Sequence, residues 1–259
     1  MSLTQIMPFI STVVILAFAA MVFRRYFVAR TPAFLFWGLG LAMFAIASFA
    51  EAYLALAWSP WAFFAWYLFG AALNAAWIGH GTLYLLAQKP WVHAVTALLV
   101  VGSLLAAYLM SQAMPTLDEG AFAPGLPISE QYGTKVLQPG ETAPAGRETG
   151  VVTYRGEQVT VVRGLLPLGT PVRLATPFFN IYGVTLLVGG ALWSAYLLRK
   201  KQGPANRVQG NLLIAAGALL VASASTLARF GIGQYLYLGE LLAAVLMFAG
   251  FLLAGRKPK

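Results

Sequence analysis

The sequence predicts an all-α polytopic membrane protein with seven transmembrane helices, and three observations carry that prediction. Hydrophobic residues make up 59% of the 259 residues and charged residues only 10%, which lies outside the range of ordinary soluble domains. Seven segments approach the roughly 20 apolar residues that a helix needs to cross a bilayer. Lysine and arginine cluster at alternate connections between those segments, as they do in membrane proteins of fixed orientation.

The predicted spans group as three, one and three along the chain. The first, at 7–23, is expected to be a retained anchor rather than a signal peptide, because its arginines follow the apolar run instead of preceding it. The remaining spans are predicted at 33–57, 62–86, 92–110, 178–198, 208–227 and 235–254. This divides the chain into helices 1–4 over residues 1–111, a loop over 112–175, and helices 5–7 over 176–259.

The placement of the +9 net charge predicts the orientation. The basic clusters that begin at Arg24, Lys89, Arg199 and Arg256 all fall on one side of the membrane if there are seven spans. By the positive-inside rule that side is the cytoplasm, so the N-terminus is expected outside and the C-terminus inside. The expected partner of these clusters is the lipid bilayer and not nucleic acid. A basic, cysteine-free, alanine-rich chain with short loops is typical of a bacterial inner membrane protein.

The segment 112–175 differs from the spans in its glycine, proline, threonine and charge content. Residues alternate in polarity at 150–154 and again at 158–162, and Arg155-Gly156-Glu157 between them predicts a hairpin turn. The first half of the segment, up to Gly150, carries five prolines and is expected to lack regular structure. We therefore predict a partly β extracytoplasmic insertion that caps the bundle, with a disordered loop as the alternative.

Glu51 and Glu240 are the two acidic residues that lie inside predicted spans. An ionisable group within a membrane helix is costly, and it usually has a partner or faces a water-filled cavity. Glu51, Asn180, Arg229 and Glu240 fall at a similar depth near the outer ends of four spans. One interpretation is an outward-facing pocket in which Arg229 pairs with one carboxylate and the other serves a cation, proton or ligand. The alternative is a structural ion pair together with an interfacial glutamate that reaches water.

His80 is the only histidine within a span and lies deeper, together with Asn74. A proton-relay or ligand-binding role is one hypothesis for His80, and a hydrogen bond to a neighbouring helix is the other. Haem bound by His80, with His93 as second axial donor, is a further alternative, and otherwise no cofactor is expected. Asn74 is expected to hydrogen-bond across the bundle.

These features favour a protein that binds, and in one version transports, a small molecule or an ion through Glu51, Asn74, His80, Asn180, Arg229 and Glu240. The competing hypothesis is a non-catalytic membrane subunit whose loop docks a partner protein. A membrane-embedded enzyme is the third hypothesis, and the sequence favours it least. It contains no phosphate-binding loop, no zinc-protease motif and no cysteine. The histidines and the two buried carboxylates are expected on opposite sides of the membrane, so no metal site is predicted.

Overall fold

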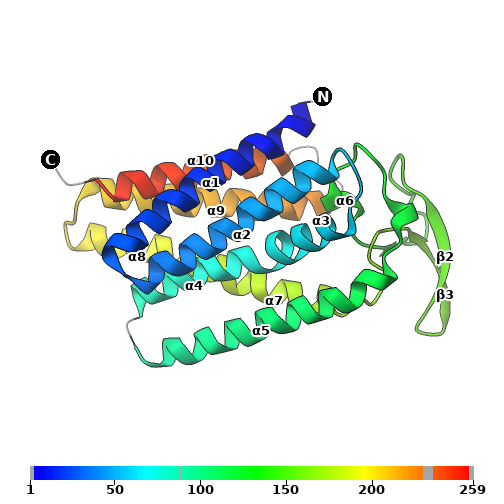
Figure 1. The fold of residues 1–259 in the computed structure, drawn as a ribbon, viewed down its shortest axis with the longest axis horizontal. Coiled ribbons are helices and arrows are strands. Elements are labelled where there is room, and N and C mark those ends of the chain that lie inside the picture. Colours follow the sequence, from blue (N-terminus) through cyan, green and yellow to red (C-terminus); the bar gives the residue numbers. More distant parts are fainter. Residues whose placement is uncertain (1–2, 88, 230–235, 257–259) are drawn as a thin grey trace.

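Seven helices of the protein are long and apolar enough to cross a membrane, as the sequence predicts. The computed structural model describes residues 3–87, 89–229 and 236–256. The seven spans are Ile6–Ala29, Pro32–Leu54, Pro60–Leu86, Trp91–Thr116, Val172–Lys200, Ala205–Leu227 and Leu236–Ala254. They lie side by side in one elongated bundle (Figure 1). The fold and composition together define a multi-pass integral membrane protein.

The first, second, sixth and seventh spans are each formed by a single α-helix, and the fourth is formed by an α-helix followed by the 3-10 helix η2 (Met114–Thr116). These helices are α1 (Leu3–Ala29), α2 (Pro32–Leu54), α5 (Trp91–Ala113), α9 (Ala205–Arg229) and α10 (Leu236–Ala254). The third and fifth spans each contain a π-helical segment. The third is built from α3 (Pro60–Ala65), η1 (Trp66–Leu73) and α4 (Asn74–Leu86), and the fifth from α7 (Val172–Val184), η4 (Thr185–Gly189) and α8 (Gly190–Lys200). A π segment is rare in any helix and often marks a functional region.

Several helices extend beyond their predicted bounds, α1 from Leu3 to Ala29 among them, and two of the other differences have a local explanation. Helix α2 ends at Leu54, before residue 57, because Ser59 and Pro60 already begin the next helix and the Ser59 side chain caps it. Helix α7 begins at Val172, ahead of the predicted start at 178, and it contains Pro177. This proline falls in the second turn, where it removes only one helical hydrogen bond.

Glycines bring pairs of helices into direct backbone contact. A Cβ atom at Gly79 of α4 would lie 2.6 Å from the Gly183 carbonyl oxygen of α7. The same distance separates a Cβ atom at Gly210 of α9 from the Gly250 carbonyl oxygen of α10. Membrane helices commonly associate through small residues in this way. Helix α5, in contrast, lies along the edge of the bundle away from α1 and α10, and most of its residues face outward (Figure 1).

Residues 117–171 form an insertion at one end of the bundle, which we call the loop end; we call the opposite end the basic end (Figure 1). The insertion holds η3 (Glu119–Ala121), α6 (Ile128–Gln131), and the strands β1 (Lys135–Val136), β2 (Thr149–Tyr154) and β3 (Glu157–Val162). The strands make an antiparallel sheet in the order β1-β3-β2. Arg155 and Gly156 join β2 to β3 with φ of 55° and 86°, which is the backbone that a two-residue hairpin turn requires.

The first half of the insertion is more ordered than the sequence suggests, and Gln131 is the reason. Its fully buried side chain accepts a hydrogen bond from the Ala123 amide and donates to the Ala123 and Leu126 carbonyls. These contacts satisfy backbone groups in a proline-rich stretch that has few regular hydrogen bonds of its own. The Gln131 side chain therefore supplies hydrogen bonds to backbone groups that the prolines keep out of regular secondary structure.

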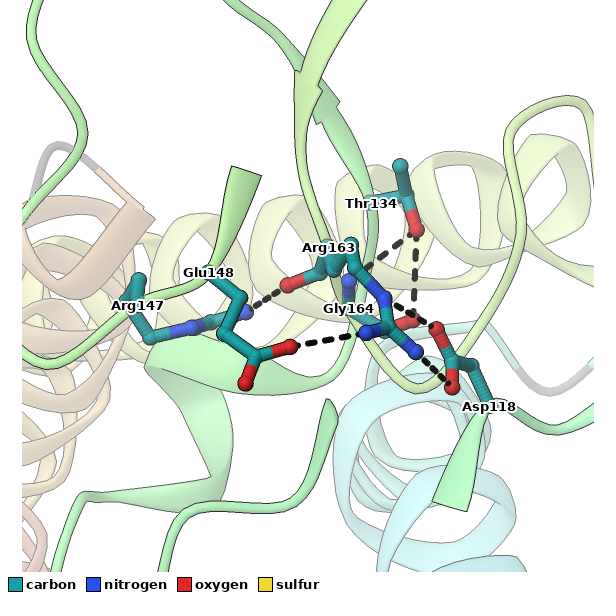
Figure 2. A network of polar contacts seen from close by, with 6 residues as sticks. All are labelled: Asp118, Thr134, Arg147, Glu148, Arg163 and Gly164. Carbon is teal, nitrogen blue, oxygen red and sulfur yellow. Dashed lines mark hydrogen bonds and ion pairs between the residues drawn. The ribbon is translucent and has the colours of Figure 1, made fainter. Parts of the chain in front are cut away.

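Figure 2 shows the polar network at the centre of the insertion. The Arg163 guanidinium donates two hydrogen bonds to Asp118, at 2.9 and 2.7 Å, and a third to Glu148 at 2.7 Å. Hydrogen bonding to Asp118 and the charge of that carboxylate raise the pKa of the Arg163 guanidinium above its ordinary value. Arg147 donates to the backbone carbonyls of Glu130 and Arg163. The network ties the end of β3 to the segments on both sides of it.

We expect Arg163→Met to loosen the insertion without affecting the spans. Bidentate contact with Asp118 is lost, but the side chains are about one third exposed, so we expect only a small cost in unfolding free energy. Limited proteolysis should then cut residues 117–171 faster than in the unmodified protein. Arg155→Met at the exposed hairpin turn is the control and should leave the cleavage rate unchanged. Equal cleavage of the two variants would contradict the assigned role of Arg163.

Candidate functional site

The carboxyl groups of Glu51 and Glu240 meet near the loop end of the bundle. Glu51 lies in the last turn of α2 and is 3% exposed, whereas Glu240 lies in the second turn of α10 and is partly exposed. Their side chains are within hydrogen-bonding reach of each other. Two ionised carboxylates repel each other strongly at such a separation in an apolar interior, so a proton or another cation between them stabilises the pair.

Aromatic side chains and the insertion enclose the carboxyl pair. The Trp66 indole, at the first position of the π segment η1, donates a hydrogen bond to Glu51. Tyr237 of α10 lies beside both carboxyls, and its hydroxyl hydrogen-bonds with the backbone of Ile128 in α6. Ile128 is buried with Trp66 and Leu165 in one apolar cluster. The insertion therefore covers the end of the bundle at which the two glutamates meet.

Three buried side-chain oxygen atoms of α1 and α2 have no hydrogen-bond partner within the described part of the chain. They are Glu51 Oε1, Ser48 Oγ and Ser11 Oγ. Ser48 lies one turn from Glu51 on the same face of α2, and both serines are almost fully buried. A buried polar atom without a partner is uncommon in native proteins and frequently points to a bound water or ion.

Ser11 of α1 lies at the same depth as Glu240. Met7 packs against Leu236 and Tyr237, which fixes the level of α1 relative to α10. Both helices run inward from the loop end (Figure 1). Ser11 follows Met7 by four residues on α1, and Glu240 follows Leu236 by four residues on α10. Both therefore lie about 6 Å deeper in the bundle than the Met7 contact. The unpartnered oxygens thus come from two helices, α1 and α2, at the level of a carboxyl from a third, α10.

Two of the predicted ligand-binding residues bond to the backbone of the distorted third span. They are Asn74, which belongs to that span, and Asn180 of α7. In a regular α-helix the Ala75 amide would donate to the Ala71 carbonyl. Here the Asn74 side chain accepts from the Ala75 amide, and Asn180 of α7 donates to the Ala71 carbonyl at 2.9 Å. The prediction that Asn74 bonds across the bundle is wrong, because its side chain serves the backbone at the junction of η1 and α4.

His80 is fully buried and both of its ring nitrogens have partners. Nδ1 is 2.6 Å from the Tyr182 hydroxyl of α7, and Nε2 is 2.8 Å from the Thr96 hydroxyl of α5. Thr96 is 2.8 Å from the Tyr84 hydroxyl, which in turn is 3.1 Å from Nδ1 of the exposed His93. A continuous chain of hydrogen bonds therefore links the buried histidine to the surface at the basic end, and it joins α4, α5 and α7.

These hydrogen bonds bear on the haem hypothesis for His80. Iron would need a ring nitrogen that now bonds Tyr182 or Thr96, and the two histidines are bridged by hydroxyl groups rather than facing each other across a free space. Haem at His80 would therefore require these hydrogen bonds to be broken, and the haem alternative stays a prediction. Among the described residues, no three His, Cys, Asp or Glu side chains come together as a metal site.

Arg229, the predicted partner of a carboxylate, ends helix α9, but its side chain lies outside the described residues. Its pairing with Glu51 or Glu240 therefore stays a prediction. Trp66 contacts Glu51, Ser48 shares its helix face, and Ser11 lies at the depth of Glu240. The sequence did not single out these three as site residues. For Ser48 a signal existed, since it precedes Glu51 by three residues and so shares its helix face.

Comparisons with protein-family models, with curated proteins and with solved structures find no match to this chain. The class that the fold defines is an integral membrane protein with seven candidate membrane spans. Within that class, the proposal of a function rests on the geometry of the Glu51 and Glu240 carboxyl groups.

Proposed function

We propose that the protein binds a monovalent cation in exchange for a proton at Glu51 and Glu240, as the ion-binding step of transport across the membrane. The observation that carries the proposal is the buried Glu51 carboxyl, which lies against a second carboxyl and has one oxygen without a partner among the described residues. The alternative of a structural ion pair rests on Arg229, whose side chain lies outside the described residues.

Charge conservation supports the exchange. Two carboxylates that share one proton carry a net charge of about −1, and the same two carboxylates around a monovalent cation also carry about −1. The occupant can therefore change without altering the charge buried in the apolar interior, and such a change in charge would be expensive. A divalent ion would not preserve this balance.

The oxygen atoms around the pair support a hard cation. The carboxyl groups of Glu51 and Glu240 and the hydroxyl groups of Ser11 and Ser48 are all oxygen donors, which alkali cations prefer over nitrogen or sulfur donors. Glu240 is partly exposed, and in our proposal the ion enters from its side of the pair. In our proposal the loop end faces the outside of a bacterial inner membrane and the basic end faces the cytoplasm, following the positive-inside rule.

The exchange can be measured as proton release. We expect sodium chloride, added to detergent-purified protein in weak buffer with a pH indicator, to release up to one proton per protein molecule. Choline chloride at equal ionic strength should release none, because choline is too large for the site. Glu51→Gln and Glu240→Gln should each abolish the release. Release by choline and sodium alike would contradict the proposal.

Glu157→Gln is the matched control, since Glu157 is an exposed glutamate at the start of β3. It removes the same charge and should leave sodium-dependent release unchanged. Reconstitution then tests transport separately from binding. Vesicles with an imposed pH gradient should accumulate radioactive sodium with the unmodified protein but not with Glu240→Gln, and accumulation by both would overturn the transport step.

A further inference from the structure

A cavity of about 310 Å³ opens between α1 and α10 at the basic end, far from the carboxyl pair. Arg24 and Arg25 of α1 and Arg256, which follows α10, are among the residues that line it. Met21, Val28 and Leu252 supply apolar walls. One cavity therefore combines a cationic part with a hydrocarbon part, at the level at which a membrane helix meets the headgroups.

Arg25 is held in place rather than extended into solvent. Its Nη2 donates to the Gly255 carbonyl at 3.2 Å, and its guanidinium lies over the rings of Phe34 and Phe251. Gly255 permits this approach, because a Cβ atom at that position would lie 2.8 Å from Cζ of Arg25. Asn206 of α9 donates to the carbonyls of Leu253 and Arg256, which fixes the chain that carries Arg256. The Arg25 side chain and the backbone that carries Arg256 are therefore held in place.

In the described part of the chain, no acidic side chain balances these arginines. The eight aspartates and glutamates of the sequence are Glu51 and Glu240 near the loop end and six in the insertion. Three guanidinium groups around one cavity create a strongly positive potential there, which attracts an anion from outside the chain. Guanidinium groups suit phosphate in particular, because their N–H groups match pairs of phosphate oxygens.

We propose that this cavity binds an anionic phospholipid, with its phosphate between Arg24, Arg25 and Arg256 and its acyl chains against Met21, Val28 and Leu252. Basic pockets between membrane helices are known recognition sites for anionic headgroups. The apolar walls favour a lipid over a free phosphate ion, because only the lipid covers them. The site is independent of the carboxyl pair and of the cation proposed to bind there.

Native mass spectrometry of the full chain in detergent tests the proposal. Added phosphatidylglycerol should bind in preference to phosphatidylcholine, and inorganic phosphate at equal concentration should not displace it. Each arginine near a headgroup contributes about fivefold to affinity, so Arg24→Gln with Arg256→Gln should weaken phosphatidylglycerol binding about 25-fold. Gly255→Ala should displace Arg25 and weaken binding about fivefold, the effect of removing one arginine.

Arg199→Gln with Lys200→Gln is the matched control, since it removes two charges at the same end from α8, outside the cavity. It should change binding by about twofold at most, because water and salt screen distant charges. An equal loss in the control, or equal binding of phosphatidylcholine, would overturn the proposal. Displacement of the lipid by inorganic phosphate would assign the site to a free anion and overturn the lipid assignment as well.

Discussion

Gly183→Val should destabilise the bundle strongly, because the added side chain meets the backbone of a neighbouring helix. A Cβ atom at this position would lie 2.5 Å from the Ala76 amide nitrogen and still closer to the backbone of Ala75. Backbone atoms cannot move aside as the end of a side chain can, so α4 and α7 must separate. Overpacking of this kind costs about 3 kcal/mol of unfolding free energy. Unfolding in mixed detergent micelles, followed by far-ultraviolet circular dichroism, measures the loss.

Gly189→Val provides the matched comparison for this effect. Gly189 lies in the same span, within η4, and a Cβ atom there would meet nothing within 4 Å. The same side chain should therefore change the unfolding free energy by less than about 0.5 kcal/mol. If both variants lost equal stability, a general effect of valine in this span, and not the contact between α4 and α7, would explain the loss at Gly183.

His80→Leu should also destabilise the bundle, by a smaller amount than Gly183→Val. The change removes two hydrogen bonds between helices and leaves the Tyr182 and Thr96 hydroxyls without their histidine partner inside the bundle. A hydrogen bond between membrane helices contributes roughly 0.6 kcal/mol on average, and a buried hydroxyl without a partner adds a further cost. Together these effects predict a loss of about 2 kcal/mol of unfolding free energy, which the same experiment in mixed micelles measures.

His93→Leu tests whether position in the hydrogen-bonded chain matters. His93 is exposed at the end of that chain, so Tyr84 can exchange it for water or a lipid headgroup. We expect a change within about 0.5 kcal/mol. A loss as large as that of His80→Leu would mean that the chain acts as one unit from the surface inward, and the explanation of His80 as a local contact between helices would be wrong.

The spans were predictable from the sequence because their signal is local. Twenty apolar residues in a row must satisfy their backbone groups as a helix in lipid, whatever lies beside them, so hydropathy alone predicts seven spans. The turn between β2 and β3 was predictable for the same reason, because Arg155-Gly156 falls between two runs of alternating polarity. The π segments were not predictable, because they depend on partners such as Asn180, which bonds the Ala71 carbonyl from another span.

Depth along each helix follows from residue counts, and these counts place Glu51 and Glu240 at one level of the bundle. Whether they face each other depends on the rotation of α2 and α10 about their axes, and uniformly apolar helices carry little information about rotation. The close packing of α1 with α2 and α10, through which Ser11 reaches the same level, fixes that rotation. The pattern of apolar residues therefore dictates which polar groups must leave water, whereas contacts between helices select which of those groups meet.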